Sequence, residues 1–433
     1  MGGDKKRVLI LGAGGAGINA ALELKKASAG TPELEVTLVD QREYSVLMPF
    51  IWQVVSGSVA PSHISFPLPA LLRQRGAGTP VKFRQGLVQS IDVARKVVST
   101  DNGELEWDYL VIALGSTTNF FGIADVEKSS LSLKSTKDAI SIHNHILNNY
   151  QAALQERDER RRRELLTFVV VGGGPTGVEL VAAIQDFVRK ALIQIYPSLM
   201  PQTRVLLVEA QGALLSGLKA KMSGLAIHRL RSRGIELLLK TRITKVWAGG
   251  IQTADGRTIP TRTVIWVAGV KPAAVVGALP FNKAKDGRII VNQYLEVPES
   301  PRVYVVGDCA YSLQEHSSVP YPPTQQVAQR QGPACARNII RAIQGKDQQA
   351  FRYKFKGQLI YAGRNVVLAQ IWDRVFDGFV GALLRRVYYL WAFVSYLGLR
   401  TEFMRKMGAV GDWIPAYFYR RNTGRLDRLP QVT

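Results

Sequence analysis

The chain has 433 residues, 46% of them hydrophobic and 21% charged, which suits two or three globular domains and excludes a disordered chain. Basic residues outnumber acidic ones by 56 to 34, so the formal net charge is +22. We find no base-reading motif, which argues against a nucleic-acid partner. Two interpretations of the positive charge remain: it attracts the chain to an anionic membrane surface, or it belongs to basic faces that are simply solvated. We favour the membrane interpretation.

The N-terminal sequence, the cysteines and the histidines argue against a secreted, a disulfide-rich or a metal-binding protein. The start, MGGDKKRVLI, passes from charged residues into an apolar stretch too short for a secretory signal peptide. Only Cys309 and Cys335 occur, so we expect no disulfide framework and a reducing compartment. The five histidines are scattered, and His143 and His145 diverge on a predicted helix, so we expect no metal site.

A glycine-rich turn follows the first predicted strand. The strand at 7–11 leads into Gly12, Gly14 and Gly17 and then a helix, and the next strand ends at Asp40. In a G-x-G-x-x-G turn the missing side chains let backbone N–H groups approach a pyrophosphate at a helix N-terminus, and the carboxylate accepts hydrogen bonds from ribose hydroxyls. The alternative, a glycine turn in ordinary α/β packing, is less favoured because strand, turn, helix and carboxylate occur together.

The same pattern occurs a second time. A strand at 165–171 leads into Gly172, Gly174 and Gly177 and a further helix, and the following strand ends at Glu209. A carboxylate at this place favours the free 2′-hydroxyl of NADH over the 2′-phosphate of NADPH, and no arginine follows it directly. Two such units predict two different dinucleotides, because hydride transfer needs a donor and a bound acceptor.

The remaining segments complete a duplicated α/β pattern. Residues 80–112 alternate polar and apolar positions as a small meander does, and 136–166 are helical in pattern. Apolar strands are predicted at 109–116, 263–269 and 302–308, and a long helix is predicted from Gln325 to about Ile343.

The tail from about residue 350 loses this alternation and is rich in aromatic residues and arginine. Its apolar run at 387–399 has 13 residues, fewer than the roughly 20 that a membrane-spanning helix needs. Arg385, Arg386 and Arg400 flank the run, which indicates a segment lying in the headgroup layer of a membrane. A buried helix or a dimer interface is the alternative.

These features together resemble the two-dinucleotide-domain flavoprotein superfamily that includes the disulfide reductases, and within it the type II NADH:quinone oxidoreductases. The resemblance covers nearly the whole chain and is carried by these stretches: YSVLMPFIWQVVSGSV, YLVIALGS, GGGPTGVEL, VIWVAGV, VYVVGDCA, YPPTQQVAQRQG and GDWIPAYF. It implies an α/β fold with two Rossmann-like dinucleotide-binding domains, for FAD and NADH, and a C-terminal amphipathic membrane-binding region. The implied domain limits are 1–135 and 276–345 for the FAD domain, 136–275 for the inserted NADH domain and 346–433 for the membrane-anchoring region.

The resemblance also implies site residues. FAD would contact Gly12, Gly14, Gly17, Asp40, Gly115, Gly307 and Asp308. NADH would contact Gly172, Gly174, Gly177, Glu209, Ala268 and Gly269. Glu179 would lie beside the nicotinamide and flavin as the catalytic residue, and Gln326 with Arg330 would meet the quinone. Arg330 is a departure, because the family pattern has a second glutamine there.

The implied function is passage of hydride from NADH to FAD and of two electrons to a membrane quinone, without proton pumping, at the cytoplasmic face of the cell membrane. The chain would bind there peripherally, and the sequence leaves open whether it forms a homodimer. Three alternatives remain: a flavin-dependent NADH dehydrogenase with a non-quinone acceptor, a sulfide:quinone reductase-like enzyme, and a non-catalytic membrane-associated NAD(H)-binding flavoprotein. Thiol chemistry is disfavoured because residues 46–55 contain no cysteine and Cys309 and Cys335 suit apolar packing.

Overall fold

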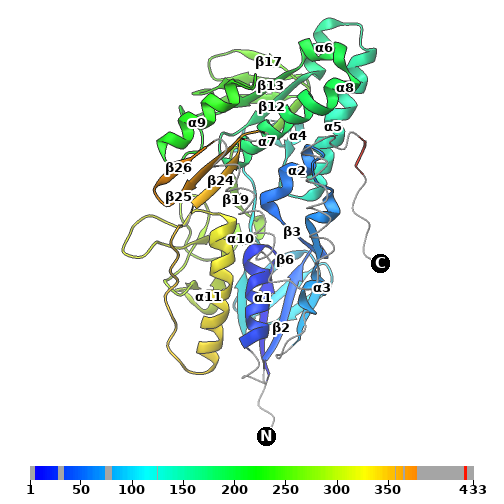
Figure 1. The fold of residues 1–433 in the computed structure, drawn as a ribbon. Helices are drawn as coiled ribbons and strands as arrows, with labels where there is room; N and C mark the ends of the chain where they lie inside the picture. Colours follow the sequence, from blue (N-terminus) through cyan, green and yellow to red (C-terminus); the bar gives the residue numbers. More distant parts are fainter. Residues whose placement is uncertain are drawn as a thin grey trace.

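The computed structural model describes residues 5–27, 34–73, 80–123, 125–355, 357–363, 366–377 and 424–426. Two parallel β-sheets form the centres of two α/β units, each with helices packed on it (Figure 1). The predicted pair of Rossmann-like units is therefore confirmed. Of the predicted membrane-anchoring region at 346–433, residues 378–423, which include the apolar run at 387–399, lie outside the described residues.

The first sheet has six strands in the order β21-β22-β9-β1-β2-β5, parallel except at the edge strand β21. The strands are β1 (Lys6–Leu11), β2 (Leu34–Asp40), β5 (Val81–Gln85), β9 (Tyr109–Ile112), β21 (Glu296–Val297) and β22 (Ser300–Val305). Every residue of β9 is buried, as expected of a parallel strand covered on both faces. Strand β9 pairs with β22, although the whole second sheet lies between them in the sequence. The second unit is therefore an insertion, after which the chain returns to the first sheet.

The second sheet has five parallel strands in the order β11-β18-β12-β13-β14. They are β11 (Leu131–Ser132), β12 (Thr167–Val171), β13 (Arg204–Val208), β14 (Glu236–Leu238) and β18 (Thr263–Trp266). The chain passes from the first unit to the second through β10 (Ser116–Thr118) and returns through β19 (Val270–Pro272). These two strands pair with each other in an antiparallel ribbon.

Smaller sheets cap these centres. The predicted meander is present as β6 (Val88–Asp92), β7 (Val97–Thr100) and β8 (Gly103–Glu106), whereas β5 and β9 belong to the parallel sheet. The second unit carries β15 (Ile243–Trp247), β16 (Gly250–Thr253) and β17 (Thr258–Pro260). Two short pairs are β3 (Tyr44–Val46) with β4 (Ser65–Pro67), and β20 (Ile289–Ile290) with β23 (Ala310–Tyr311).

Apart from α9 (Ala220–Arg231), the long helices lie in segments that the sequence predicts to be helical. These are α1 (Gly15–Ala27), α5 (Thr136–Gln155), α7 (Pro175–Phe187) and α11 (Gln325–Ile343). The shorter ones are α2 (Ile51–Val55), α3 (Leu68–Leu72), α4 (Val126–Ser129), α6 (Glu159–Leu165), α8 (Ile193–Ile195) and α10 (Ala274–Gly277). Helices α1 and α11 lie side by side (Figure 1), and a side chain at Gly332 would meet the Ala16 carbonyl oxygen at 2.1 Å. The close approach brings the start of α11 to the first glycine turn.

A three-stranded antiparallel sheet follows α11 along the chain. Its strands are β24 (Gly357–Tyr361), β25 (Val367–Ile371) and β26 (Arg374–Phe376). The sheet lies against α7 and α9 of the second unit (Figure 1). In the part of the chain that the structure describes, no helix combines the length and the apolar character needed to cross a bilayer.

Candidate functional site

The two glycine turns have equivalent backbone geometry. Gly12 has φ +96°, and a Cβ there would lie 2.4 Å from the Ala113 carbonyl oxygen. Gly172 has φ +117°, and a Cβ there would lie 2.6 Å from the Ala268 Cα. Both positions exclude any residue with a side chain, because positive φ and the neighbouring strand forbid it together.

The third glycine of each turn permits the helix to begin close to the strand. A Cβ on Gly17 would lie 1.8 Å from the Gly12 carbonyl oxygen, and a Cβ on Gly177 would lie 1.8 Å from the Gly172 carbonyl oxygen. The identical clash distance shows that both turns close in the same way, as the third glycine of a dinucleotide-binding turn requires.

The middle glycines face open space. A Cβ on Gly14 or on Gly174 would meet no atom within 4 Å. Glycine is therefore not required there by the protein's own packing, and the open side is available for a group that approaches the backbone N–H groups at the helix start.

Asp40 at the end of β2 is nearly buried and is held by the backbone. Its two carboxylate oxygens accept hydrogen bonds from the backbone N–H groups of Ala13 at 2.7 Å and Arg42 at 2.8 Å. A carboxylate offers about four acceptor positions, so two remain for a ligand. The carboxylate thus fixes the glycine turn and still has room for a ribose hydroxyl.

Glu209 follows β13 and repeats this arrangement in the second unit. Its carboxylate accepts hydrogen bonds from the backbone N–H groups of Gly173 at 2.6 Å and Gln211 at 2.7 Å. Asp40 and Glu209 therefore play the same structural part in the two units, each tying the second residue of a glycine turn to the end of the neighbouring strand.

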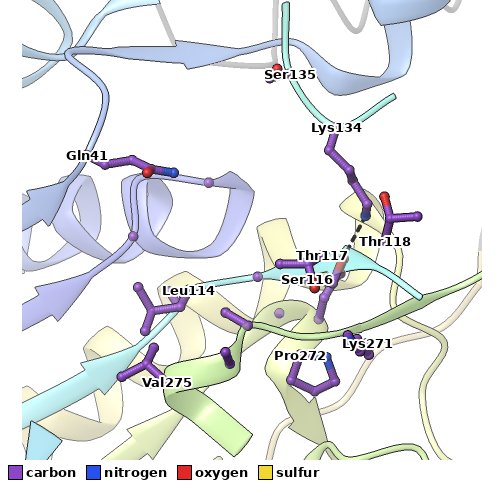
Figure 2. Close-up of a pocket in the computed structure, with 18 of the residues that line it drawn as sticks. Gln41, Leu114, Ser116, Thr117, Thr118, Lys134, Ser135, Lys271, Pro272 and Val275 are labelled. Carbon is purple, nitrogen blue, oxygen red and sulfur yellow. Dashed lines mark hydrogen bonds between the residues drawn. The ribbon is translucent and has the colours of Figure 1, made fainter. Parts of the chain in front are cut away.

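A cavity of about 1350 Å³ opens beside the first glycine turn. This volume exceeds the roughly 300–1,000 Å³ of sites for drug-sized ligands, as a dinucleotide would require. Six of the seven residues predicted to contact FAD line it: Gly12, Gly14, Asp40, Gly115, Gly307 and Asp308. Figure 2 shows the part of its wall formed by β10, by the start of α5 and by the segment around Lys271 and Pro272.

A chain of polar side chains crosses one wall of this cavity. Lys134 donates a hydrogen bond to Ser116 Oγ at 3.0 Å (Figure 2). Ser116 in turn donates to Asp308 Oδ2 at 2.7 Å. Burial lowers the pKa of Lys134, and the Asp308 carboxylate offsets part of that effect. An ammonium has three N–H donors, so the remaining two can reach an anionic group in the cavity.

Lys134 is a site residue that the sequence did not predict. It lies directly before α5, and its backbone N–H donates to Asp138 Oδ2 at 2.8 Å, while the Ser135 side chain caps the helix. The capping pattern S-x-x-D could have fixed the helix start in the sequence. Nothing in the sequence indicates that this lysine reaches a cavity beside the first sheet.

The end of β22 is tied to α11. The Gln331 side chain is buried and accepts a hydrogen bond from the Gly307 backbone N–H at 2.7 Å. Gly307 has φ +74°, so the turn that presents Asp308 favours glycine. Cys309 follows directly, and its thiol lies 3.1 Å from the Gly115 carbonyl oxygen.

The residues predicted to contact NADH lie around the second turn and not in this cavity. Gly172 is packed so closely against Ala268 that no side chain fits between them, and Gly269 follows at the end of the same strand segment. Gly177 and Glu209 complete the group through the turn contacts described above. The two sets of predicted residues are therefore separate, one set for each unit.

Glu179 lies on α7, two residues after Gly177, and is half-buried. Its Oε1 accepts a hydrogen bond from the Tyr361 backbone N–H at 3.2 Å, so the last residue of β24 meets this carboxylate. The Tyr361 ring stacks on Trp52 at 4.4 Å between centroids, and its hydroxyl bonds to the buried Asp186. Tyr361 thus links β24 to α7 through Glu179 and Asp186, and to α2 through Trp52.

The two residues predicted to meet a quinone differ in their surroundings. Gln326 accepts a hydrogen bond from the Tyr353 hydroxyl at 2.8 Å and donates one to the Gly357 carbonyl oxygen at 2.9 Å. Arg330 lies one turn later on α11 and is exposed to solvent. Gln326 thus bonds to Gly357 at the start of strand β24, whereas Glu179 bonds to Tyr361 at its end.

The two cysteines offer no reactive thiolate. Both are fully buried and unpaired in the structure. Burial raises the pKa of the Cys309 thiol to about 12, and it also raises the pKa of Cys335. Within the described ranges, no three His, Cys, Asp or Glu side chains come together as metal ligands would.

Comparison with known proteins identifies the family. The model of the pyridine nucleotide-disulphide oxidoreductase family matches residues 6–332, three quarters of the chain. The chain belongs to this family. As an oxidoreductase of this kind it carries the two-unit architecture without an exposed cysteine pair in its described residues.

Relatives and solved structures that resemble the chain do so over most of its length. The type II NADH:quinone oxidoreductase of Staphylococcus aureus (strain MSSA476) is 28% identical over 416 residues, covering 95% of this chain and 98% of the relative. The solved structure of NDH2 from Plasmodium falciparum in complex with NADH is 20% identical, with a TM-score of 0.86 over 97% of this chain and 99% of that one. The sulfide:quinone oxidoreductase of Aquifex aeolicus is 20% identical, with a TM-score of 0.70 over 96% of each chain. The two structures share the fold of this family member.

Proposed function

We propose that this oxidoreductase is a FAD-dependent enzyme that oxidises NADH and reduces a membrane quinone, without pumping protons. The observation that carries the proposal is the pair of equivalent glycine turns, one of which opens into the large cavity. The likeness to the type II relatives over 95% of the chain supports the choice of substrates. A bound flavin supplies the chemistry, because it takes up two electrons from NADH and passes them to the quinone.

The first unit has a cavity that fits FAD. The N–H groups at the start of α1 and the open side of Gly14 suit a pyrophosphate, and Asp40 has acceptor positions left for a ribose. Asp308 and Ser116 line the part of the cavity where a polyhydroxyl chain would find hydrogen-bond partners. The proposed FAD contacts are Gly12, Gly14, Gly17, Asp40, Gly115, Gly307 and Asp308.

The second unit is the proposed NADH site. The open side of Gly174 at the start of α7 suits the pyrophosphate, and Glu209 suits a ribose with a free 2′-hydroxyl. The carboxylate would repel the 2′-phosphate of NADPH, which supports a preference for NADH. The proposed NADH contacts are Gly172, Gly174, Gly177, Glu209, Ala268 and Gly269.

Glu179 is the proposed catalytic residue. Its half-buried carboxylate is fixed by the Tyr361 backbone N–H, and its place two residues after the second glycine turn puts it on the helix that would carry NADH. A fixed carboxylate in this position can orient the nicotinamide ring or hold the proton that quinone reduction consumes.

Gln326 and Arg330 are the proposed contacts for the quinone carbonyl oxygens. One N–H of the Gln326 amide bonds to Gly357, which leaves the other as a donor. Arg330 is exposed one helical turn away and supplies further donors. Their proximity on α11 supports a common binding surface for the quinone head group.

The chain is proposed to bind the cytoplasmic face of the cell membrane peripherally. The net charge of +22 supports attraction to anionic lipids. The aromatic and basic segment at 385–413, which lies outside the described residues, is the proposed point of attachment.

An assay of NADH oxidation with a short-chain soluble quinone, with and without vesicles of anionic lipid, tests the proposal. We expect quinone to be consumed in equal amount to NADH, NADPH to be a poor donor, and the protein to sediment with anionic but not neutral vesicles. NADH oxidation that does not depend on quinone would instead support a different acceptor. The mass of the active enzyme in detergent tests whether it is a homodimer.

A further inference from the structure

Phe121 combines two features that are unusual for a phenylalanine. Its side chain is 58% exposed, and its backbone has φ +54°, in the left-handed region that non-glycine residues seldom adopt. A conformation of this kind costs free energy and persists only where the surrounding structure imposes it, which is often at a functional site.

Hydrogen bonds from Asn119 fix the backbone around Phe121. The Asn119 side-chain oxygen accepts from the Phe121 N–H at 2.9 Å, and the Asn119 N–H donates to the Gly269 carbonyl oxygen at 3.0 Å. The Asn119 carbonyl oxygen accepts from the Trp266 indole at 2.9 Å. The loop is therefore attached to the end of strand β18, which carries Trp266.

The residues on either side of Phe121 hold the loop to the protein interior. Phe120 and Ile123 both pack on the hydrophobic core of the second unit, and the Ile123 N–H donates to the Phe120 carbonyl oxygen at 3.1 Å. Phe120 also lines the cavity of the first unit. Because Phe120 and Ile123 pack inward while Phe121 is exposed, the Phe121 ring projects from a loop that apolar packing and hydrogen bonds hold in place.

The Phe121 ring lies over Gly269. A Cβ built on Gly269 would lie 2.7 Å from Phe121 Cζ and 3.2 Å from Cε2, so the ring occupies the space that a side chain at 269 would fill. Gly269 follows Ala268, whose Cα lies against Gly172 of the second glycine turn. The ring therefore lies beside the strand end that contacts the second glycine turn, and the preceding residue, Phe120, lines the cavity of the first unit.

We propose that Phe121 is a fixed aromatic platform on which the nicotinamide ring of NADH stacks, and so a residue that positions NADH for transfer to the neighbouring unit. The inference rests on the proposed NADH site of the second unit. An exposed aromatic ring on a rigid loop loses little conformational entropy when a planar ring stacks on it, and every planar heterocycle offers a face for such stacking. Gly269 is required because any side chain there would displace the platform.

The test compares Phe121→Ala, Phe121→Leu and Phe121→Trp in the FAD-loaded enzyme. Calorimetry with NAD+, which binds without reducing the flavin, gives the Kd, and steady-state assays give the KM for NADH. We expect Phe121→Ala to raise both constants about tenfold, Phe121→Leu to raise them less, and Phe121→Trp to keep them near the wild-type values. Leu154→Ala, which removes another exposed apolar side chain at the end of α5, is the matched control and should change neither.

Binding of ADP separates the two ends of the dinucleotide. ADP carries no nicotinamide, so its Kd should be the same for Phe121→Ala and the wild type. Equal weakening of ADP and NAD+ would overturn the nicotinamide assignment, and wild-type Kd and KM values in Phe121→Ala would overturn the platform altogether. Wild-type enzyme that binds no NAD+ and oxidises no NADH would contradict the proposed function itself, which distinguishes the two failures.

Discussion

At the scale of single residues, Glu179 connects the second unit to strand β24 through one hydrogen bond from the Tyr361 backbone. The family resemblance singled out this residue, but the sequence could not show what holds it, because its partner lies 182 positions away. Residues that follow a short motif are predictable in this way, whereas their partners depend on the folded chain.

Replacing Glu179 by glutamine tests its proposed role. The amide keeps the size and can still accept a hydrogen bond from Tyr361, but it cannot hold a proton at neutral pH. We expect turnover with quinone to fall about 10²-fold, with FAD content unchanged. Turnover rate and flavin content are measured for this variant and for Glu104→Gln, an exposed control in the meander. Unchanged turnover in Glu179→Gln would remove Glu179 from the mechanism.

The buried His143 predicts how stability depends on pH. Burial lowers its pKa from 6.5, and hydrogen bonds to the carbonyl oxygens of Val55 and Gly424 offset this in part. The unfolded chain therefore takes up the proton first as pH falls, so the free energy of unfolding decreases between pH 6.5 and the lower folded-state pKa, by at most about 1.4 kcal/mol per pH unit. Above pH 6.5 this effect is absent.

His143→Gln removes the titrating group and should give a smaller loss of stability on acidification. Urea unfolding at pH 7 and pH 5.5 measures the difference. His145, whose pKa burial also lowers, remains as a second contributor, so the dependence should diminish and not vanish. An identical pH dependence in the variant and the wild type would show that His143 is not linked to folding.

At the scale of elements, the strand–turn–helix units were the most predictable part of the fold. The helix predicted from Gln325 to about Ile343 is present at 325–343, and the structure shows that the Thr324 side chain caps its start. Strands β24–β26 were not predicted, because they follow no helix alternation and their pairing is set by packing on α7 and α9. The hydrogen bonds of Lys134 and the position of Phe121 were also beyond reach, since both join segments distant in sequence.

The glycines of the second turn provide a matched pair of variants. Gly177→Ala places a Cβ 1.8 Å from a backbone oxygen, so the turn must distort and both stability and NADH binding should be lost. Gly174→Ala meets no atom within 4 Å and has φ −71°, so the fold should persist while a methyl group obstructs the pyrophosphate. Thermal unfolding and the KM for NADH separate the two; a large fall in Tm for Gly174→Ala would contradict this account.

At the scale of the whole molecule, the second unit contributes to the cavity of the first. Lys134 follows β11, a strand of the second sheet, and its ammonium reaches Ser116 beside Asp308. Cofactor binding should therefore hold the two units together, because one cation in the cavity wall comes from the segment that begins the second unit.

Lys134→Met tests this connection. We expect FAD to bind about tenfold more weakly, since an anionic cofactor loses a cation in a partly buried cavity. Lys137→Met removes an exposed lysine three residues further on and should leave FAD binding unchanged. Titration of the flavin-free protein with FAD measures both, and equal affinity in Lys134→Met and the wild type would show that this cation does not meet the cofactor.

Electrons are proposed to pass from NADH through a resident flavin to a quinone. Rapid mixing of the purified holoenzyme with NADH in the absence of oxygen, followed by addition of a soluble quinone, tests it most directly. We expect NADH to bleach the absorbance of the oxidised flavin, and quinone to restore it at a rate no slower than turnover. Flavin that NADH leaves oxidised, or reduced flavin that quinone does not reoxidise, would contradict the account.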